Sequence, residues 1–527
     1  MRVLLFQWFL LITIQIINAT SSIAQQQQGI EWAVSYGGAS IDVGNSIQLT
    51  SDGGYVAIGK SRSSDGDITV NHGREDYWVV KISSDGSIQW QKSFGGSSED
   101  NGRFVQGTSD GGYILIGFTM SNDGDVIGNH GGYDCWVVKL DSIGDIEWQR
   151  ALGGSGMDAG VSIIQTSDGG YAMISVSDSN DGDVYGNNGQ TDFWVVKLSE
   201  LGNIEWQKSL GGSSSETASS IQQTADGGYI VSGQSSSNDG DVTGNHGDSD
   251  FWIVKLSSFG DIQWQNSYGG AAYDHGLSIQ ETADGGYITC GFVESNNGNV
   301  TFNHGSRDVW VLKLSNNGDL EWEKSFGGTG DDWGHEIQIT SDGGYVILGH
   351  SNSNDGDVFN IHGSRDYWAI KLSNFGVLEW QKTLGGSESD IGHSIRQTLD
   401  GGFILIGESQ SNDGDVTGNH GASDYWIVKL NATIGLSEFS DFEWTIVSPN
   451  PVTSRLTIKV SLTNSEDLQV YIRDLLGHVV LEPIKLNNVS GLVEQSISTT
   501  MLSDGMYLLD IVGLKWRKTK RIIIVQR

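Results

Sequence analysis

The feature that most constrains this chain is an internal repeat of 58 residues that covers most of its length. One tryptophan, in IEWQ-type phrases, recurs at Trp32, Trp90, Trp148, Trp206, Trp264, Trp322 and Trp380. A second, in DYWVVK-type phrases, recurs at Trp78, Trp136, Trp194, Trp252, Trp310, Trp368 and Trp426. Seven copies without insertions indicate one structural unit stacked seven times, because such a unit buries its apolar faces only against its neighbours.

Each copy reads as four short β-strands, expected in the first copy at 46–50, 55–61, 76–83 and 87–95. These runs are rich in aromatic and β-branched residues, lack proline, and are separated by Gly- and Asp-rich turns. The second and third runs are apolar almost throughout, so both of their faces need cover, whereas the fourth alternates. The pattern predicts an all-β fold with four antiparallel strands per repeat.

The ends of the repeat array favour a closed ring. The array begins with a lone fourth-type strand, IEWAVSYGG from Ile30, and stops after a third-type strand at 425–431. In an open stack both strands would expose unpaired backbone groups, whereas in a ring the first strand completes the last sheet. We therefore predict a seven-bladed β-propeller over 30–431, closed by its N-terminal strand, with an open solenoid as the alternative.

Charge and the N-terminal residues indicate a secreted protein. The formal net charge is -35, and the residues before Leu436 carry the whole acidic excess, which disfavours binding to nucleic acid or anionic lipid. Residues 1–24 combine Arg2, an apolar run and a small-residue site, as secretory signal peptides do, and 25–29 form a short linker. An N-terminal membrane anchor is the alternative. No later segment is apolar enough to span a bilayer.

The loop between the second and third strands of each repeat, SNDGDVTGNHG and its variants, places carboxylates on one face of the predicted ring. Two interpretations are open: calcium ligands at D-x-D spacing, or side chains that bond their own turn. The fifth copy, NNGNVTFNHG at 296–305, loses both carboxylates, which favours the turn. The candidate calcium ligands are Asp123, Asp125, Asp239, Asp241, Asp413 and Asp415. The histidines of NHG are expected to make structural hydrogen bonds, because single histidines a blade apart cannot share a metal ion.

Positions where the copies disagree are the candidates for ligand binding. Residues next to the first strand should rim the central channel, and there the copies carry an uneven polar and aromatic set. The set suited to a sugar or peptide comprises Arg103, His275, Trp333, His335 and His393. Drift at unconstrained surface positions is the alternative explanation.

For catalysis the sequence offers no marker. A glycosidase needs two carboxylates in different environments, and a ring of equivalent Asp residues gives no reason for two to differ. No G-x-S-x-G elbow, phosphate loop or nucleophilic cysteine arrangement occurs, and Cys135 and Cys290 are expected in the core. The sequence favours a non-catalytic protein, with an enzyme as an open alternative.

After a linker at 432–444, the residues 445–527 read as a small β-sandwich. The phrases SPNPVTSRLTIKV, VYIRDLLGHVV, DGMYLLDIV and KRIIIVQR resemble the type A sorting domain of bacterial type IX secretion. The positions that match the family pattern are Pro449, Asn450, Pro451, Gly477, Gly505 and Tyr507. The resemblance implies the type IX machinery as partner, export through the outer membrane, and release or surface attachment. The repeats resemble DGGY-type repeats of secreted bacterial surface proteins.

Taken together, the sequence predicts a secreted, surface-displayed propeller that binds a glycan or peptide without chemistry. A secreted polysaccharide-degrading enzyme, a hydrolase or lyase, is one alternative, and a purely structural surface protein is another. Calcium is the one cofactor to be tested.

Overall fold

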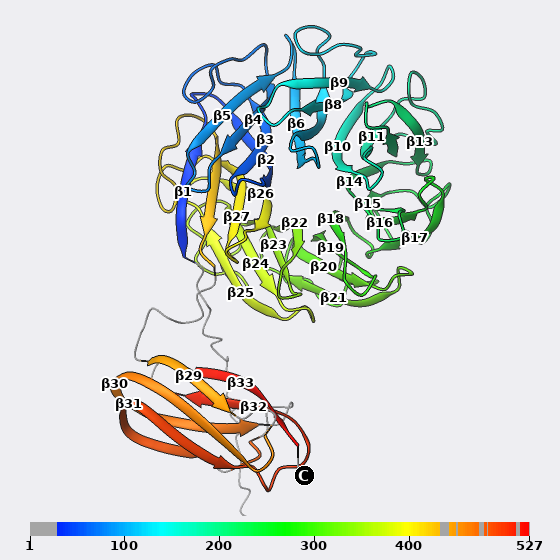
Figure 1. Cartoon of the computed structure of the whole chain (residues 1–527). Helices are drawn as coiled ribbons and strands as arrows, with labels where there is room; N and C mark the ends of the chain where they lie inside the picture. Colours follow the sequence, from blue (N-terminus) through cyan, green and yellow to red (C-terminus); the bar gives the residue numbers. More distant parts are fainter. Residues whose placement is uncertain are drawn as a thin grey trace, which may run out of the picture. The chain divides into compact units, whose positions relative to one another are not determined.

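The computed structural model describes residues 29–432, 442–448, 452–473, 479–481, 483–512 and 517–525. The chain divides into two compact units, Met1–Thr433 and Ile434–Arg527. Every regular element among the described residues is a strand (Figure 1). None of the described residues forms a helix long and apolar enough to cross a membrane. The predicted signal peptide and most of both predicted linkers lie outside the described residues.

The first unit consists of seven four-stranded antiparallel sheets arranged around a central axis (Figure 1). The innermost strands are β2 (Asp42–Leu49), β6 (Asp100–Gly107), β10 (Asp158–Gln165), β14 (Glu216–Gln223), β18 (Asp274–Glu281), β22 (Asp332–Ile339) and β26 (Asp390–Gln397). The second strands are β3 (Tyr55–Ser61), β7 (Tyr113–Thr119), β11 (Tyr171–Ser177), β15 (Tyr229–Ser235), β19 (Tyr287–Val293), β23 (Tyr345–Ser351) and β27 (Phe403–Ser409).

The outer half of each sheet repeats in the same way. The third strands are β4 (Asp76–Ile82), β8 (Asp134–Leu140), β12 (Asp192–Leu198), β16 (Asp250–Leu256), β20 (Asp308–Leu314), β24 (Asp366–Leu372) and β28 (Asp424–Leu430). The fourth strands are β5 (Ile88–Phe94), β9 (Ile146–Leu152), β13 (Ile204–Leu210), β17 (Ile262–Tyr268), β21 (Leu320–Phe326), β25 (Leu378–Leu384) and, in the last sheet, β1 (Ile30–Tyr36).

Strand β1 closes the ring, as predicted. It pairs antiparallel with β28, from Ile30 opposite Leu430 to Tyr36 opposite Tyr425. The first and last sheets share one apolar core, and the Tyr425 hydroxyl donates to the Trp78 carbonyl at 2.9 Å across it. The same bond joins later blades, for example from Tyr367 to the Trp426 carbonyl at 2.9 Å. The fold is therefore a closed seven-bladed propeller rather than a solenoid.

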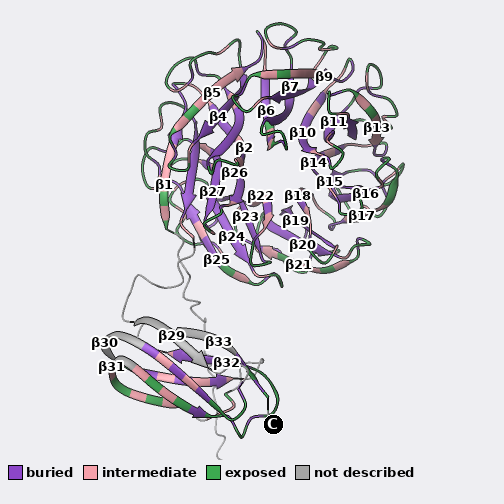
Figure 2. Ribbon diagram, in the orientation of Figure 1, coloured by how far each residue is buried: buried purple, intermediate pink, exposed green. Residues whose placement is uncertain are grey.

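The burial pattern follows the sequence pattern. The third strands are buried at every residue, whereas the fourth strands keep exposed and half-buried positions (Figure 2). Each third strand carries a tryptophan buried between blades; Trp194, for example, is fully buried and its Nε1 donates to Gln207 at 2.7 Å. Truncation of such a side chain costs about 3–5 kcal/mol. Blade packing therefore explains why these tryptophans recur.

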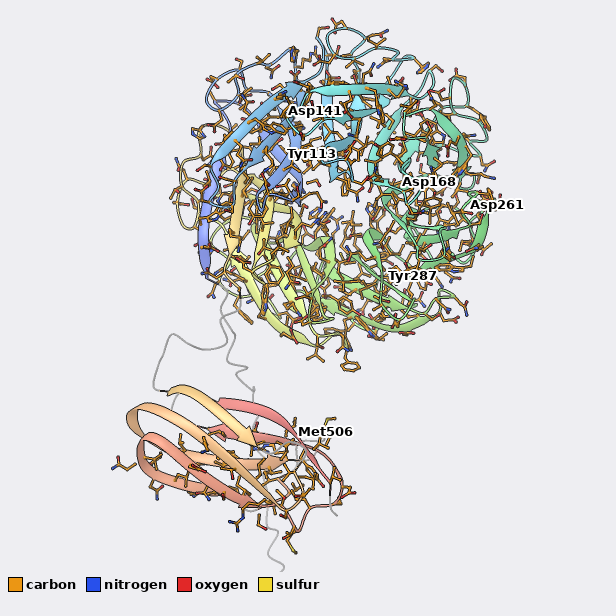
Figure 3. The ribbon with its side chains drawn as sticks, viewed as in Figure 1. Tyr113, Asp141, Asp168, Asp261, Tyr287 and Met506 are labelled. Carbon is orange, nitrogen blue, oxygen red and sulfur yellow. The ribbon has the colours of Figure 1, made fainter. Side chains whose placement is uncertain are left out.

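The DGGY phrase forms a turn that is tied to the third strand by an ion pair. Gly170 donates its backbone N–H to Asp168 at 3.0 Å, and the buried Lys197 ammonium lies 3.0 Å from the same carboxylate. Asp168 is labelled in Figure 3. Burial raises the pKa of this carboxyl, but hydrogen bonds from Thr166, Gly170 and Lys197 outweigh that effect and lower the pKa to about 2. All seven copies make this Lys–Asp pair, so the motif is structural.

The predicted strand boundaries of the first copy hold to within one residue, with one larger difference. The innermost strand of the first blade begins at Asp42, four residues before the predicted start at Ser46. Its pairing with β3 shifts register between Gly44 and Ser46, so a β-bulge lies within the strand. The bulge interrupts the period of two by which a strand is recognised in a sequence, and this hid the first four residues.

The second unit is a five-stranded sheet with one apolar core. Its strands are β29 (Phe442–Ser448), β30 (Arg455–Arg473), β31 (Ile484–Ser498), β32 (Gly505–Val512) and β33 (Arg517–Ile524). The long β30 pairs with β29 through its first half and with β32 through its second, so it belongs to both layers of a small sandwich. Of the sorting-motif positions, Gly505 begins β32 and Tyr507 is buried, with its hydroxyl donating to the Ser503 carbonyl. Pro449, Asn450, Pro451 and Gly477 lie outside the described residues.

Candidate functional site

The bulge of the innermost strands builds a ring of seven side chains around the axis. Each of these strands shifts register at the same place, leaving one residue out of the ladder. A bulge re-aims the side chain of the extra residue. The seven residues line a central cavity of about 190 Å³ and are Asn45, Arg103, Val161, Ser219, Leu277, His335 and His393.

The structure brings three of the five predicted ligand residues together in this cavity. Arg103, His335 and His393 are members of the ring, and the rings of His335 and His393 meet edge to face at 5.1 Å between centroids. Trp333 and His275 stand two positions earlier on their strands and do not line the cavity. Trp333 stacks on His335 at 5.8 Å, and the Ser219 hydroxyl lies 3.2 Å from His275 Nε2. Trp333 and His275 therefore contact residues that line the cavity without lining it themselves.

Comparison of the seven repeat copies did not identify two further residues of this wall, Phe292 and His350. The register places Phe292 opposite His275 and His350 opposite Trp333. Phe292 packs against Trp333 with ring centroids 4.0 Å apart, and His350 Nδ1 lies 3.1 Å from His335 Nε2. The sixth residue of each second strand differs between copies, and that variation was the available signal.

An arginine caps the aromatic pair. The Arg307 guanidinium lies 5.1 Å from the ring centre of Phe292 and 5.2 Å from that of Trp333. Glu294 holds it through a hydrogen bond of 2.6 Å to Nε. The faces of Phe292 and Trp333 are therefore engaged within the protein.

Burial keeps the imidazoles of this sector neutral. It lowers the pKa of His275 to about 3 and that of His335 to about 4. Burial, followed by the neighbouring His335, also lowers the pKa of His350 and of His393 well below the ordinary value. Neutral imidazole carries one donor and one acceptor, so at neutral pH these rings offer both kinds of hydrogen bond without charge.

The candidate calcium ligands make hydrogen bonds that connect neighbouring blades. Asp123 accepts the backbone N–H of Ser97 at 2.7 Å, and Asp125 accepts that of Gly95 at 3.2 Å. The equivalent pairs Asp239 with Asp241 and Asp413 with Asp415 do the same.

In the fifth copy, amides replace these carboxylates without changing the bonds. Asn297 accepts the N–H of Ala271 at 2.8 Å, and Asn299 accepts that of Gly269 at 3.2 Å. An amide oxygen therefore suffices, which supports the turn interpretation. No three His, Cys, Asp or Glu side chains among the described residues gather as metal ligands do. The calcium hypothesis stays a prediction.

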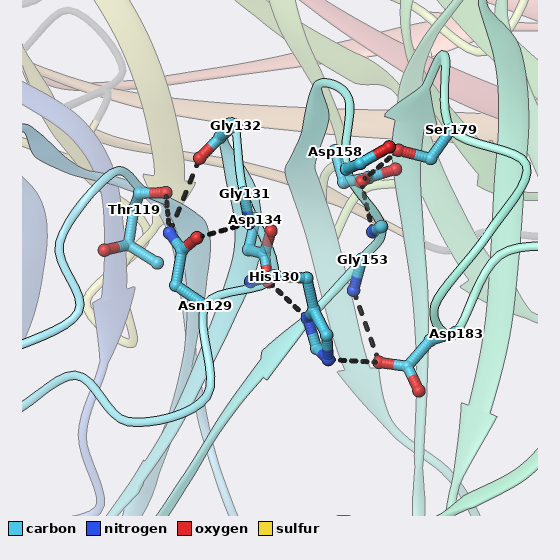
Figure 4. A network of polar contacts seen from close by, with 12 residues as sticks. Thr119, Asn129, His130, Gly131, Gly132, Asp134, Gly153, Asp158, Ser179 and Asp183 are labelled. Atoms are coloured by element: carbon cyan, nitrogen blue, oxygen red, sulfur yellow. Dashed lines mark hydrogen bonds and ion pairs between the residues drawn. The ribbon is translucent and has the colours of Figure 1, made fainter.

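Each of the six loop histidines lies within hydrogen-bond distance of an Asp of its own blade. Two of them, His130 and His304, also approach an Asp of the next blade, and Figure 4 shows His130. His130 Nδ1 lies 2.7 Å from Asp134 Oδ2 in its own blade, and His130 Nε2 lies 4.0 Å from Asp183 of the next blade. Asp134 is fully buried. Burial raises the pKa of this carboxyl, although the bonds from His130 oppose the rise. These imidazoles have the structural role expected of them.

Residues 447–525 match the family described as a secretion system C-terminal sorting domain. The chain is a substrate of type IX secretion. It is therefore an exported protein with a secreted or cell-surface location. The family match covers the second unit and leaves the role of the propeller open.

Three solved structures are similar to the chain at low identity. One is a fungal alcohol oxidase of the AA5 family in complex with copper, with 11% identity, 95% of this chain and 99% of that chain covered, and a TM-score of 0.41. Another is BBS1N in complex with ARL6DN, with 8% identity, 76% of this chain and 96% of that chain covered, and a TM-score of 0.41. The third is a glycoside hydrolase family 43 arabinoxylan arabinofuranohydrolase from Bacillus subtilis in complex with cellotetraose, with 10% identity, 92% of this chain and 94% of that chain covered, and a TM-score of 0.28. At these values they carry no argument about activity. No curated protein matches the chain.

Proposed function

We propose that the propeller is a non-catalytic binding module, displayed at the cell surface, that takes a glycan at the channel mouth. The observation that carries this proposal is the uneven ring of bulge residues. Arg103, His335 and His393 converge on one cavity, whereas the repeated tryptophans and tyrosines pack between blades.

The chemistry of the cavity wall suits a sugar. Besides the neutral imidazoles, the wall carries the serines that follow the bulge: Ser46, Ser162, Ser220, Ser278 and Ser394. Sugar hydroxyls are both donors and acceptors, and so are serine hydroxyls and neutral imidazoles. A ligand rich in hydroxyls can therefore satisfy this wall without introducing a charge.

The carboxylates near the cavity argue against glycoside hydrolysis. Glu336 is the one carboxylate among the described residues that line it. This side chain forms an ion pair with Arg396 and accepts the backbone N–H of Ile395 at 2.8 Å. A glycosidase needs two carboxyl groups at a set separation, one of them free to donate a proton. This wall offers neither, which supports binding rather than turnover.

The test is a glycan array, run beside a peptide array, with the purified full-length chain. We expect the affinity for a saccharide to fall at least tenfold in His393→Ala. It should stay unchanged in Val161→Ala, which shortens an apolar side chain of the same ring. Binding confined to peptides would overturn the glycan assignment, and turnover of a saccharide would show an enzyme. The absence of any saturable ligand would leave a structural surface protein.

A further inference from the structure

Arg103 is a cation with no carboxylate in ion-pair contact among the residues that the structure describes. Its side chain is exposed to the channel, and its guanidinium lies 5.6 Å from the ring centre of Phe118. No hydrogen bond or ion pair from this guanidinium occurs among the described residues. An arginine offers five donors in a planar fork, so most of its hydrogen-bonding capacity faces the cavity.

The carboxylates that could neutralise Arg103 are already engaged. Glu75, whose charge acts on Arg103, forms an ion pair with Arg62 and lies 3.4 Å from Lys60. Glu336, on the cavity wall, is paired with Arg396. The neutral imidazoles across the cavity add no charge. Arg103 therefore makes the cavity locally positive within a chain whose net charge is -35.

The size of the cavity limits what enters it. Whole small-molecule sites usually measure about 300–1,000 Å³, whereas this cavity measures about 190 Å³. It can admit one end of a ligand, with the remainder outside the mouth. The acidic body disfavours a ligand that is negatively charged along its length.

We propose that the group entering the cavity is the carboxylate of a terminal acidic sugar, a uronic acid, held by Arg103. This inference rests on the proposed glycan function and names the chemistry of its ligand. A carboxylate fits the guanidinium fork with two parallel hydrogen bonds. His335 and His393, which line the same cavity, donate to or accept from the ring hydroxyls.

The test is calorimetry on the full-length chain with two probes, glucuronate and glucose, at low and at physiological salt. We expect glucuronate to bind at least tenfold more tightly than glucose, with the difference shrinking as salt rises. Arg103→Gln should weaken glucuronate binding about 10- to 100-fold, as expected for the loss of hydrogen bonds to a charged group. Its effect on glucose binding should be at least several-fold smaller, and glucuronate binding of Arg103→Lys should fall between that of Arg103→Gln and that of the parent.

Arg74→Gln is the matched control, because Arg74 is an exposed arginine of a first-blade loop, 3.6 Å from Glu99, and does not line the cavity. It should change neither probe. Equal affinity for both probes, or an equal loss of both in Arg103→Gln, would overturn the inference and leave glycan binding intact. Failure of glucuronate to bind at millimolar concentration would also overturn it. If no saccharide on the glycan array bound, the proposed glycan-binding function would be wrong as well.

Discussion

The third blade lacks the histidine that the other six carry, and this offers a direct test of how blades are held together. Asn188 stands where the other copies have His72, His130, His246, His304, His362 and His420. Its backbone N–H still donates to Asp192 at 2.9 Å, but its side chain makes no hydrogen bond among the described residues. We predict that Asn188→His stabilises the propeller at neutral pH.

The magnitude follows from the state of Asp192. Burial, joined by the charges of Glu216 and Asp241, raises the pKa of this fully buried carboxyl from 3.8 to about 6. Because the folded-state pKa is raised, the penalty grows as the pH rises from about 4 to 6 and is complete above that. The difference corresponds to at most about 3 kcal/mol at pH 7.5.

An introduced imidazole should recover part of this penalty. In the other blades Nδ1 lies 2.5–2.8 Å from the equivalent carboxylate. Those imidazoles are 24–43% exposed, so screening weakens the bond and we expect a gain of about 1–2 kcal/mol.

The assay is urea unfolding at pH 7.5, followed by tryptophan fluorescence. The melting temperature should rise by only about 1–2 °C, because the unfolding entropy of roughly 400 residues is large. The reciprocal change His246→Asn should cost a similar amount, and Asn188→Ala should stay within about 0.5 kcal/mol of the parent. A neutral or destabilising Asn188→His, beside a neutral His246→Asn, would refute the idea that the imidazole–carboxylate pair stabilises the blade interface.

Three further outcomes follow from the titrating groups and the loops. Burial raises the pKa of many blade-interface carboxyls, which favours low pH, but it lowers the pKa of His275 and His335, which costs stability as the pH falls below about 6.5. His335→Gln should therefore gain up to about 1 kcal/mol relative to the parent between pH 7.5 and pH 5.5 in urea unfolding, and an equal pH dependence of the two proteins would contradict this. Gly95→Ala places a Cβ 2.6 Å from Asp100 Oδ2 and 2.9 Å from Asp76 Oδ1; it should cost about 2 kcal/mol or more in urea unfolding, whereas Gly107→Ala, with open space around its Cβ, should be nearly neutral. Excess chelator should leave the melting temperature unchanged, since the loop carboxylates already accept backbone N–H groups; a rise of several degrees with calcium would instead establish the calcium hypothesis.

The ring could be predicted because its evidence is redundant. Seven tryptophans fix the period, and the orphan strand beginning at Ile30 matches the incomplete sheet that ends at Leu430. Closure then follows from the cost of unpaired strand edges. The period is thus redundant, whereas closure depends on the correct interpretation of this one strand.

The site could be predicted only in part, because its side-chain directions depend on a bulge. An unbroken ladder would alternate the residues after Asp100 between the two faces of the strand, whereas the bulge turns Arg103 into the cavity and leaves Phe104 paired. The contributions of Phe292 and His350 depend on cross-strand register, which period counting does not give. The D-x-D spacing was ambiguous for another reason, since turn-capping and calcium-binding loops use the same oxygen atoms.

The location of function follows from what each position of the repeat must do. The glycine before each loop cannot gain a side chain because one or two carboxylates approach it, and the buried tryptophan cannot shrink without opening a cavity between blades. The bulge residues line the channel, and of these seven Val161 is the one that packs against a blade-interface core. The copies can therefore differ at most of these positions at little cost in stability. Differences at Arg103, His335 and His393 are therefore the ones a ligand can select, whereas a change at an interface position would first be felt as a loss of folding.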